Sequence, residues 1–407
     1  MIGGGETNTV TGTGTGPGFC VLQVLPGLAG GAAERGAIDM AGALAEAGGR
    51  AVVASEGGPE EHRLARTGAV HVKLPLSSKN PLVMRRNIAR LRDVIEVHGV
   101  DIVHARARLP AWTALAAARR TGRRLVTTFH GAYAIGNALN RRYNGVLAMG
   151  DRVIAPSEFI ARHVLLNYKV DPSRLRVIPG GVDLATFDPA KVSSERIIAL
   201  ANRYRLPDGM PVVMLPGRLS RRKGQALLLQ ALTRLGGVDF CCVLVGPDGA
   251  RKTYRRELEA IVARDGLSDR AILLEECQDM PAAYMLADVV VSAATEPEAF
   301  GRVIAEAQAM GRPVVASNHG SAPEQVLAGE TAFLFAPGDA GALAECLRDA
   351  LAVEAIARER LAQTAMANVR ARFSKEQTRR ATLTLYRELL EGRERISAVP
   401  LCNPASA

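Results

Sequence analysis

Residues 288–307 read DVVVSAATEPEAFGRVIAEA and combine an apolar run, a short loop and a helical stretch. The three consecutive valines are β-branched and apolar on both alternate positions, which is typical of a parallel strand buried on both faces of its sheet. Phe300 and Gly301 are expected to begin the helix. The stretch therefore predicts the strand, loop and helix that repeat in a parallel α/β sheet.

The same alternation extends from this stretch in both directions along the chain. It predicts a first set of strands at 19–26, 51–55, 71–76, 101–106, 124–131, 152–157 and 174–181. After a polar stretch at 188–208 it predicts a second set at 211–219, 239–248, 271–276, 288–294, 313–318 and 331–338. Helical periodicity follows from 342 to 373 and again from 374 to 390. The chain is therefore expected to form two Rossmann-like parallel sheets, one after the other.

The length of 407 residues favours two domains, because a single core stops growing at roughly 250–300 residues. We expect a flexible tail at 1–18, an N-terminal domain at 19–190 and a C-terminal domain at 191–373. A last helix at 374–395 is expected to return to the first domain. Ligands of open α/β sheets bind beyond the carboxyl ends of the strands, so two such sheets facing each other predict a cleft between the domains.

The composition is that of a globular protein, with 48% hydrophobic and 23% charged residues. No uncharged apolar run reaches the roughly 18 residues that a membrane span needs, and the Gly/Thr-rich start does not resemble a secretory signal. The six cysteines are scattered without zinc-ligand spacing. These features favour a cytoplasmic protein with reduced cysteines.

The net charge of +10 comes with a basic first half. Its cations are Lys79, Arg85, Arg86, Arg90, Arg92, Arg106, Arg108, Arg119, Arg120, Arg123, Arg124, Arg141 and Arg142. They indicate either an anionic partner or ordinary solvated helix faces. The anionic partners expected are an acidic membrane face, a phosphorylated acceptor or nucleic acid. The first of them would place the protein at the inner face of the cytoplasmic membrane as a peripheral protein.

Two glutamates in the stretch that opens this section form the strongest chemical motif. Glu298 lies in the loop after the strand, and Glu306 follows seven intervening residues later in the helix. The helix start offers unpaired N–H groups to a phosphate. Glu306, two turns further along, is expected to accept hydrogen bonds from a ribose diol. The alternative is a pair of surface carboxylates.

A basic loop after another expected strand forms the second motif, LPGRLSRRKGQ at 215–225. Gly217 and Arg218 follow the strand, and Lys223 stands where a helix opens. Two cations beside a helix start suit a diphosphate, which Arg grips bidentately and Lys meets as a point charge. Since the chain has no Asp-x-Asp motif, no metal site is expected and the two cations would take the metal's place.

Together these segments resemble glycosyltransferase family 4, retaining enzymes of the two-domain GT-B fold, over about residues 20–390. The resemblance implies a nucleotide diphosphate sugar as donor and no cofactor. It implies that Arg218 and Lys223 hold the donor diphosphate, that Glu298 contacts the donor sugar and that Glu306 contacts the ribose. The donor-binding residues expected are Gly30, Gly31, Gly217, Arg218, Lys223, Gly246, Glu298, Phe300, Gly301 and Glu306.

The first half contributes two further family-like segments. TTFHGAY places His130 just beyond a strand, where the resemblance implies a histidine near the donor sugar, so the expected catalytic residues are His130, Arg218, Lys223 and Glu298. LAGGAAERG supplies Gly30 and Gly31, which resemble the family's Gly-Gly loop. An extra alanine moves Glu34 one place from the family's glutamate, so no catalytic role is assigned to it.

The predicted reaction is transfer of a sugar to a hydroxyl acceptor with retention, by same-face attack as the resemblance implies. A saccharide or lipid-linked saccharide in lipopolysaccharide, glycolipid or other cell-envelope polysaccharide synthesis is the expected acceptor. The alternatives are a sugar-nucleotide epimerase, a phosphorylase, or a non-catalytic scaffold that binds membrane or, less readily, nucleic acid. A nicotinamide-dependent oxidoreductase is disfavoured, because no Gly-x-Gly-x-x-Gly follows the first strand.

Overall fold

The computed structural model describes residues 18–133, 135–248 and 253–397. It contains a seven-stranded and a six-stranded sheet, both built from parallel pairs. The expected strands therefore form the two Rossmann-like sheets predicted from the alternation. Most of the tail at 1–18 and the residues after 397 lie outside the described residues.

The first sheet has the strand order β3-β2-β1-β4-β5-β6-β7. The order reverses between β1 and β4, the position at which doubly wound sheets bind ligands. The strands are β1 Cys20–Val24, β2 Arg50–Ser55, β3 Val70–Lys73, β4 Ile102–Ala105, β5 Arg124–Thr128, β6 Arg152–Ala155 and β7 Leu175–Val177. The helices are α1 Ala32–Glu46, α2 Glu61–Ala65, α3 Pro81–Val97, α4 Arg108–Thr121, α5 Ala138–Asn144 and α6 Glu158–Asn167.

The second sheet has the order β10-β9-β8-β11-β12-β13, so its reversal lies between β8 and β11. The strands are β8 Val212–Pro216, β9 Cys241–Val245, β10 Ala271–Leu274, β11 Val289–Ser292, β12 Val314–Ser317 and β13 Ala332–Phe335. The helices are α7 Ser194–Tyr204, α8 Gln225–Leu232, α9 Thr253–Arg264, α10 Met280–Leu286, α11 Arg302–Ala309, α12 Ala322–Gln325, α13 Ala340–Leu351, α14 Ala355–Arg372 and α15 Lys375–Ser397. Short 3-10 turns are η1 Gly145–Ala148, η2 Pro172–Arg174, η3 Pro189–Lys191 and η4 Arg221–Lys223.

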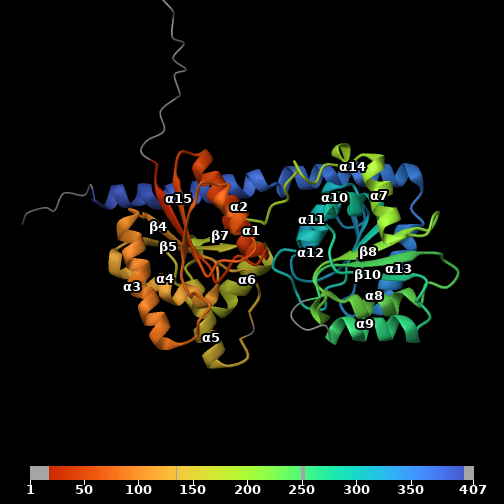
Figure 1. Ribbon diagram of the computed structural model, residues 1–407, viewed down its shortest axis with the longest axis horizontal. Coiled ribbons are helices and arrows are strands. Elements are labelled where there is room, and N and C mark those ends of the chain that lie inside the picture. Colours follow the sequence, from red (N-terminus) through yellow and green to blue (C-terminus); the bar gives the residue numbers. More distant parts are fainter. Residues whose placement is uncertain (1–17, 134, 249–252, 398–407) are drawn as a thin grey trace, which may run out of the picture. The chain divides into compact units, whose positions relative to one another are not determined.

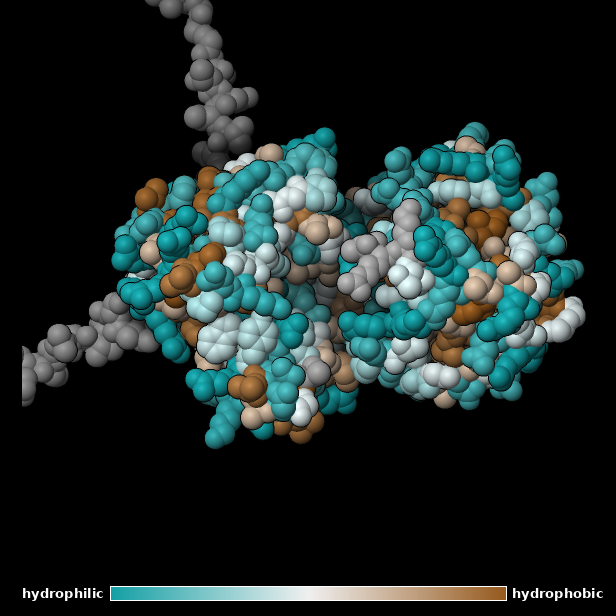
Figure 2. Space-filling view, turned by 60° about the horizontal axis from the view of Figure 1, so that its bottom comes forward, coloured by the Kyte–Doolittle hydropathy of each residue, from teal (hydrophilic) through white to brown (hydrophobic). Residues whose placement is uncertain are grey.

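The described residues pack into two compact units. One comprises 18–127, 149–151 and 386–397, and the other comprises 128–148 and 152–385. The domain boundaries at 190 and 373 stay a prediction. On the face shown in Figure 2, hydrophilic residues cover most of the surface and apolar residues form separate patches.

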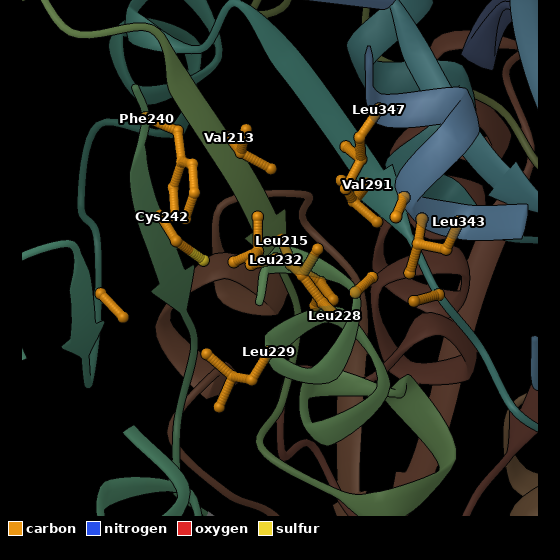
Figure 3. Close-up of a cluster of buried hydrophobic side chains, with 14 of the residues drawn as sticks. Val213, Leu215, Leu228, Leu229, Leu232, Phe240, Cys242, Val291, Leu343 and Leu347 are labelled. Carbon is orange, nitrogen blue, oxygen red and sulfur yellow. The ribbon is translucent and has the colours of Figure 1, made fainter. Parts of the chain in front are cut away.

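Helices cover both faces of the second sheet (Figure 1). Helices α8, α9 and α13 pack on one face in a cluster of Leu, Val and Ala side chains. In Figure 3, Leu228 and Leu232 of α8 lie beside Leu215 of β8, and Leu343 of α13 extends the same cluster. Helices α7, α10 and α11 pack on the opposite face. Burial on both faces explains why these strands lack alternation between polar and apolar residues.

Two helical segments differ from the sequence expectation. Helix α7 lies within the polar stretch 188–208, for which no helix was predicted, and Leu200 packs it against the core. The continuous pattern predicted for 342–373 is divided into α13 and α14 by a break at 352–354. In both places tertiary packing fixes helix boundaries that the local pattern does not show.

The last helix has its C-terminal part in the first unit. Tyr386 of α15 is fully buried there, and its hydroxyl lies 2.6 Å from His104 Nδ1 in β4. Arg106 is buried beside them and donates from Nε to Gln23 Oε1 at 2.7 Å. Burial is the main cause that raises the pKa of Tyr386, to about 12. A C-terminal helix packed on the first sheet was predicted from the sequence.

Candidate active site

The loops after β8 and β9 lie against each other at the carboxyl edge of the second sheet. Gly217 N–H donates to the Val245 carbonyl at 2.8 Å, and Leu219 N–H donates to the Pro247 carbonyl at 3.0 Å. A Cβ on Gly246 would overlap the Gly217 carbonyl, so this close approach requires a glycine. The backbones of Gly217 and Gly246, two residues expected at the donor site, are therefore in direct contact.

Lys223 and Glu298 meet at the point where the strand order reverses. Lys223 ends the turn that follows β8, Glu298 lies in the loop after β11, and Nζ is 2.6 Å from Oε1. Both side chains are about three-quarters buried. Gly224 opens α8 and touches the Ala293 carbonyl, where a Cβ would overlap, so the two loops are held together by backbone as well.

A turn after β12 completes this edge. The Ser321 N–H donates to the Glu298 carbonyl at 3.0 Å. A Cβ on Gly320 would lie 2.7 Å from the Glu298 nitrogen, so the turn approaches that closely only with glycine. His319 Nε2 donates to the Ala294 carbonyl at 2.8 Å. A small cavity of about 210 Å³ lies here, and Glu298, His319 and Ser317 are among the residues that line it.

Glu306 lies about one turn along α11, and two residues contact its carboxylate. Tyr284 of α10 donates its hydroxyl proton to Oε2 at 2.9 Å, and Arg302 Nε is 3.4 Å from Oε1. The Glu306 side chain is 13% exposed. A carboxylate held in this way keeps lone pairs available for a ribose diol.

Phe300 and Gly301 precede α11 rather than belonging to it, and Gly301 is the N-cap. The Phe300 ring packs 5.8 Å from the ring of Phe373 and against Gly180, within a small apolar cluster. An added Cβ on Gly301 would lie 3.2 Å from Glu298 Oε2. Glycine at this position therefore leaves room for the carboxylate.

The outer part of this edge carries further charges. Arg218 is exposed, and its carbonyl accepts from Gln225 Nε2 at 3.0 Å. Base and sugar selectivity are expected to depend on the segments 245–254 and 275–281. Asp279, in the second of them, accepts two hydrogen bonds from Arg196, at 2.9 and 2.7 Å. Part of the other selectivity segment, 249–252, lies outside the described residues.

The expected residues of the first sheet follow β1 and β5. Gly30 has a φ of +83° and Gly31 is the N-cap of α1. The Glu34 carboxylate folds back against Gly31, so an acid rather than a cation occupies this helix start. His130 is half-buried, two residues beyond β5. Their assignment to catalysis and donor binding stays a prediction.

The described part of the chain contains neither a metal-ligand cluster nor a membrane-spanning helix. No group of three or more His, Cys, Asp or Glu side chains is placed to hold a metal ion. No described helix has both the length and the apolar composition needed to cross a membrane.

Comparison with known proteins identifies the family of this chain. Residues 29–186 match the family model Glycosyltransferase Family 4, and residues 198–367 match Glycosyl transferases group 1. The D-inositol 3-phosphate glycosyltransferase of Xylanimonas cellulosilytica is 34% identical over 308 residues, which cover 72% of this chain and 73% of that protein. The chain belongs to glycosyltransferase family 4. It is a retaining enzyme that uses a nucleotide sugar, as predicted from the sequence.

Solved structures of this fold agree with the assignment. A glycosyltransferase from Rickettsia africae is 33% identical, with a TM-score of 0.86 over 92% of this chain and 99% of that one. WaaG, a glycosyltransferase of lipopolysaccharide biosynthesis, has a TM-score of 0.70 over 89% of this chain and 98% of that one. At 17% identity WaaG shares the GT-B fold, and no more is inferred from it.

Three residues at this edge, Tyr284, His319 and Gly320, belong to none of the sequence motifs. Tyr284 lies in α10, before β11, so the rule that functional residues follow strands does not find it. His319 and Gly320 directly follow β12, and that rule could have found them. Their segment, SNHGSAPE, contains none of the sequence motifs described above.

Proposed function

We propose that this glycosyltransferase moves a hexosyl group from a nucleotide diphosphate sugar to a hydroxyl of a phosphate-bearing acceptor, without a metal ion. The observation that carries the donor half of the proposal is the 2.6 Å contact between Lys223 and Glu298 at the reversal of the second sheet. One ammonium group has three N–H donors and can serve a carboxylate and a phosphate oxygen at once.

In this mechanism the cations act on the leaving group. Arg218 and Lys223 stabilise the charge that develops on the departing diphosphate, and the N–H groups at the start of α11 add to it. Glu298 holds hydroxyls of the donor sugar, and Glu306 holds the ribose. His130 contributes a hydrogen bond near the anomeric carbon. The diphosphate itself helps to deprotonate the acceptor hydroxyl during same-face attack.

A phosphate-bearing acceptor is supported by the chain's exposed cations and by one relative. Exposed arginines of the first half include Arg85, Arg86, Arg90, Arg119, Arg120, Arg141 and Arg142. Others are used internally: Arg92 pairs with Asp93 and Arg124 with Asp151. The Xylanimonas relative is named for a phosphorylated cyclitol, D-inositol 3-phosphate. The same chemistry occurs in lipid-linked saccharides at the cytoplasmic face of a membrane, in lipopolysaccharide, glycolipid or other envelope polysaccharide synthesis.

Calorimetric titration of UDP, GDP and ADP in the presence of EDTA tests the donor half. We expect one nucleotide to bind, and Glu306→Ala to weaken it. Turnover is then measured with sugar derivatives of that nucleotide and two acceptors, inositol 3-phosphate and a phosphorylated lipid-linked saccharide in anionic vesicles. Mass spectrometry separates a glycosylated acceptor from a rearranged donor, which an epimerase would give.

Each result bears on a separate part of the proposal. Activity that EDTA abolishes and Mg²⁺ restores contradicts metal independence. Transfer to neutral acceptors at the same kcat/KM contradicts the phosphate-bearing acceptor. Activity on the soluble acceptor alone removes the membrane from the proposal. Binding of no nucleotide contradicts the donor site itself.

A further inference from the structure

The short turn from Glu298 to Gly301 carries the donor-site carboxylate and leads into α11. The Glu298 backbone is bonded to the turn after β12 through the Ser321 N–H, and its side chain is bonded to Lys223. These contacts fix the first residue of the turn. The other end, Gly301, has no side chain of its own with which to anchor itself.

The side chain of Gln325, at the end of α12, holds that other end. Gln325 is 1% exposed. Its amide lies against both backbone groups of Gly301, and only one assignment of the amide oxygen and nitrogen gives each a complementary partner: the oxygen accepts from the Gly301 N–H at 3.1 Å, and the nitrogen donates to the Gly301 carbonyl at 3.0 Å. The oxygen also accepts from Ser321 Oγ at 3.1 Å. One buried amide therefore satisfies both backbone polar groups of the helix N-cap.

Two more buried amides donate hydrogen bonds to the backbone of Gln325. Gln308 of α11 is fully buried and donates to the Gln325 backbone carbonyl at 3.0 Å. Asn368 of α14 is 7% exposed and donates to the same carbonyl at 2.9 Å and to Gln308 Oε1 at 3.1 Å. Arg372 donates to Asn368 Oδ1 at 3.1 Å. Both amides bond to the Gln325 backbone carbonyl, which keeps its bond to Gln308 when Asn368 is replaced, and neither is bonded to the Gln325 side chain.

The bond from Gly301 to Gln325 also decides which N–H groups of α11 stay open. Since the Gly301 N–H is already paired, the donors left for a phosphate at the helix start are those of Arg302 and Val303. Their direction follows the orientation of Gly301. A rotation of this peptide would move these donors and Glu298 relative to Lys223.

We propose that Gln325 is a positioning residue of the donor site, which sets the Glu298–Gly301 turn by holding both backbone groups of Gly301. The inference rests on the proposed function of that turn in binding the donor diphosphate and sugar. It assigns a role to a residue that touches neither substrate. Glu306, which is also bonded to Tyr284 of α10, is expected to be affected least.

The test compares Gln325→Leu with the matched control Asn368→Leu, each in the full-length chain. Both replace a buried amide of one network by an apolar side chain of similar size, but only the first removes the partners of Gly301. We expect Gln325→Leu to lower kcat at saturating donor and the affinity for nucleoside diphosphate at least tenfold each. Its affinity for nucleoside monophosphate should change less than twofold. Asn368→Leu, at an equal or larger loss in Tm, should keep kcat within twofold.

A third variant separates positioning from stability. In Gln325→Glu the ionised carboxylate accepts from the Gly301 N–H but cannot donate to its carbonyl, whereas the protonated form can do both. Its kcat, relative to that of the unmodified chain, should therefore rise as the pH falls. An unchanged kcat in Gln325→Leu, or losses in both leucine variants that follow Tm alone, would overturn the proposal.

Failure of the proposed function gives a different pattern. If the unmodified chain binds a nucleoside diphosphate but transfers no sugar, the proposed transfer fails, and the affinity ratio between diphosphate and monophosphate still decides the role of Gln325. A ratio that is unchanged in Gln325→Leu contradicts the positioning role.

Discussion

The ammonium of Lys223 lies 2.6 Å from the carboxylate of Glu298, although 75 positions separate them in the chain. They meet because β8 and β11 are neighbours in the sheet and both run parallel, so the loops that follow them leave from the same edge. In the proposed mechanism the pair places a cation for the donor diphosphate beside an acceptor for the donor sugar.

Replacement of Lys223 by Ala should reduce kcat/KM for the donor by roughly 10²–10³-fold, about 2–4 kcal/mol, which is typical of the loss of one donor to developing charge. The matched control is Arg222→Ala, which removes the neighbouring exposed cation that pairs with Glu296. Steady-state kinetics with both variants check the prediction. Equal rates for Lys223→Ala and the unmodified chain would remove Lys223 from the mechanism.

Tyr284→Phe should weaken nucleotide binding by about 1–2 kcal/mol, the usual worth of a hydrogen bond to a charged group. The substitution keeps the ring, which packs 5.8 Å from that of Phe187, and removes the hydroxyl that is bonded to Glu306. Calorimetry measures the change. In a Glu306→Gln background the same substitution should have a smaller effect, and full additivity of the two changes would contradict a role through Glu306.

Gly320→Ala should raise the donor KM and lower the Tm, because its Cβ would lie 2.7 and 2.8 Å from the Glu298 nitrogen and oxygen. Gly329→Ala is the matched control: its φ of +77° is close to the +62° of Gly320, but no atom lies within 4 Å of the added Cβ. The control should lose only about 1 kcal/mol of stability from the left-handed backbone. Equal losses in both variants would show that contact with Glu298 is unimportant.

Asp279→Asn should lower the Tm at neutral pH and have no effect in acid. The hydrogen bond from Arg196 lowers the pKa of Asp279 below its ordinary value of 3.8, whereas the N-cap bond to the Ala282 N–H is available to Asn as well. A depressed pKa stabilises the fold above the unfolded pKa, and this stabilisation is lost as the pH falls below about 4. Thermal unfolding of both proteins from pH 7 to pH 3 tests this, and a pH-independent difference would contradict it.

The sequence predicted the edge of the sheet on which the site lies, because functional residues of parallel sheets follow their strands. Glu298 and Lys223 could be found in this way, and their contact confirms that they lie together. Tyr284 and Gln325 could not be found. Both lie on helices and reach the site only through packing, so neither spacing nor residue type distinguishes them from ordinary core residues.

The sequence by itself determined the two parallel sheets, since buried β-branched runs separated by helical periodicity have few other solutions. It also determined the family, because the motifs after β8 and β11 are local in the chain. Tertiary structure alone decided the strand order, and with it the meeting of Lys223 and Glu298. It alone decided which glycines permit close approach and which buried amide bonds to Gly301, because these contacts join segments whose separation in sequence carries no information about their distance in space.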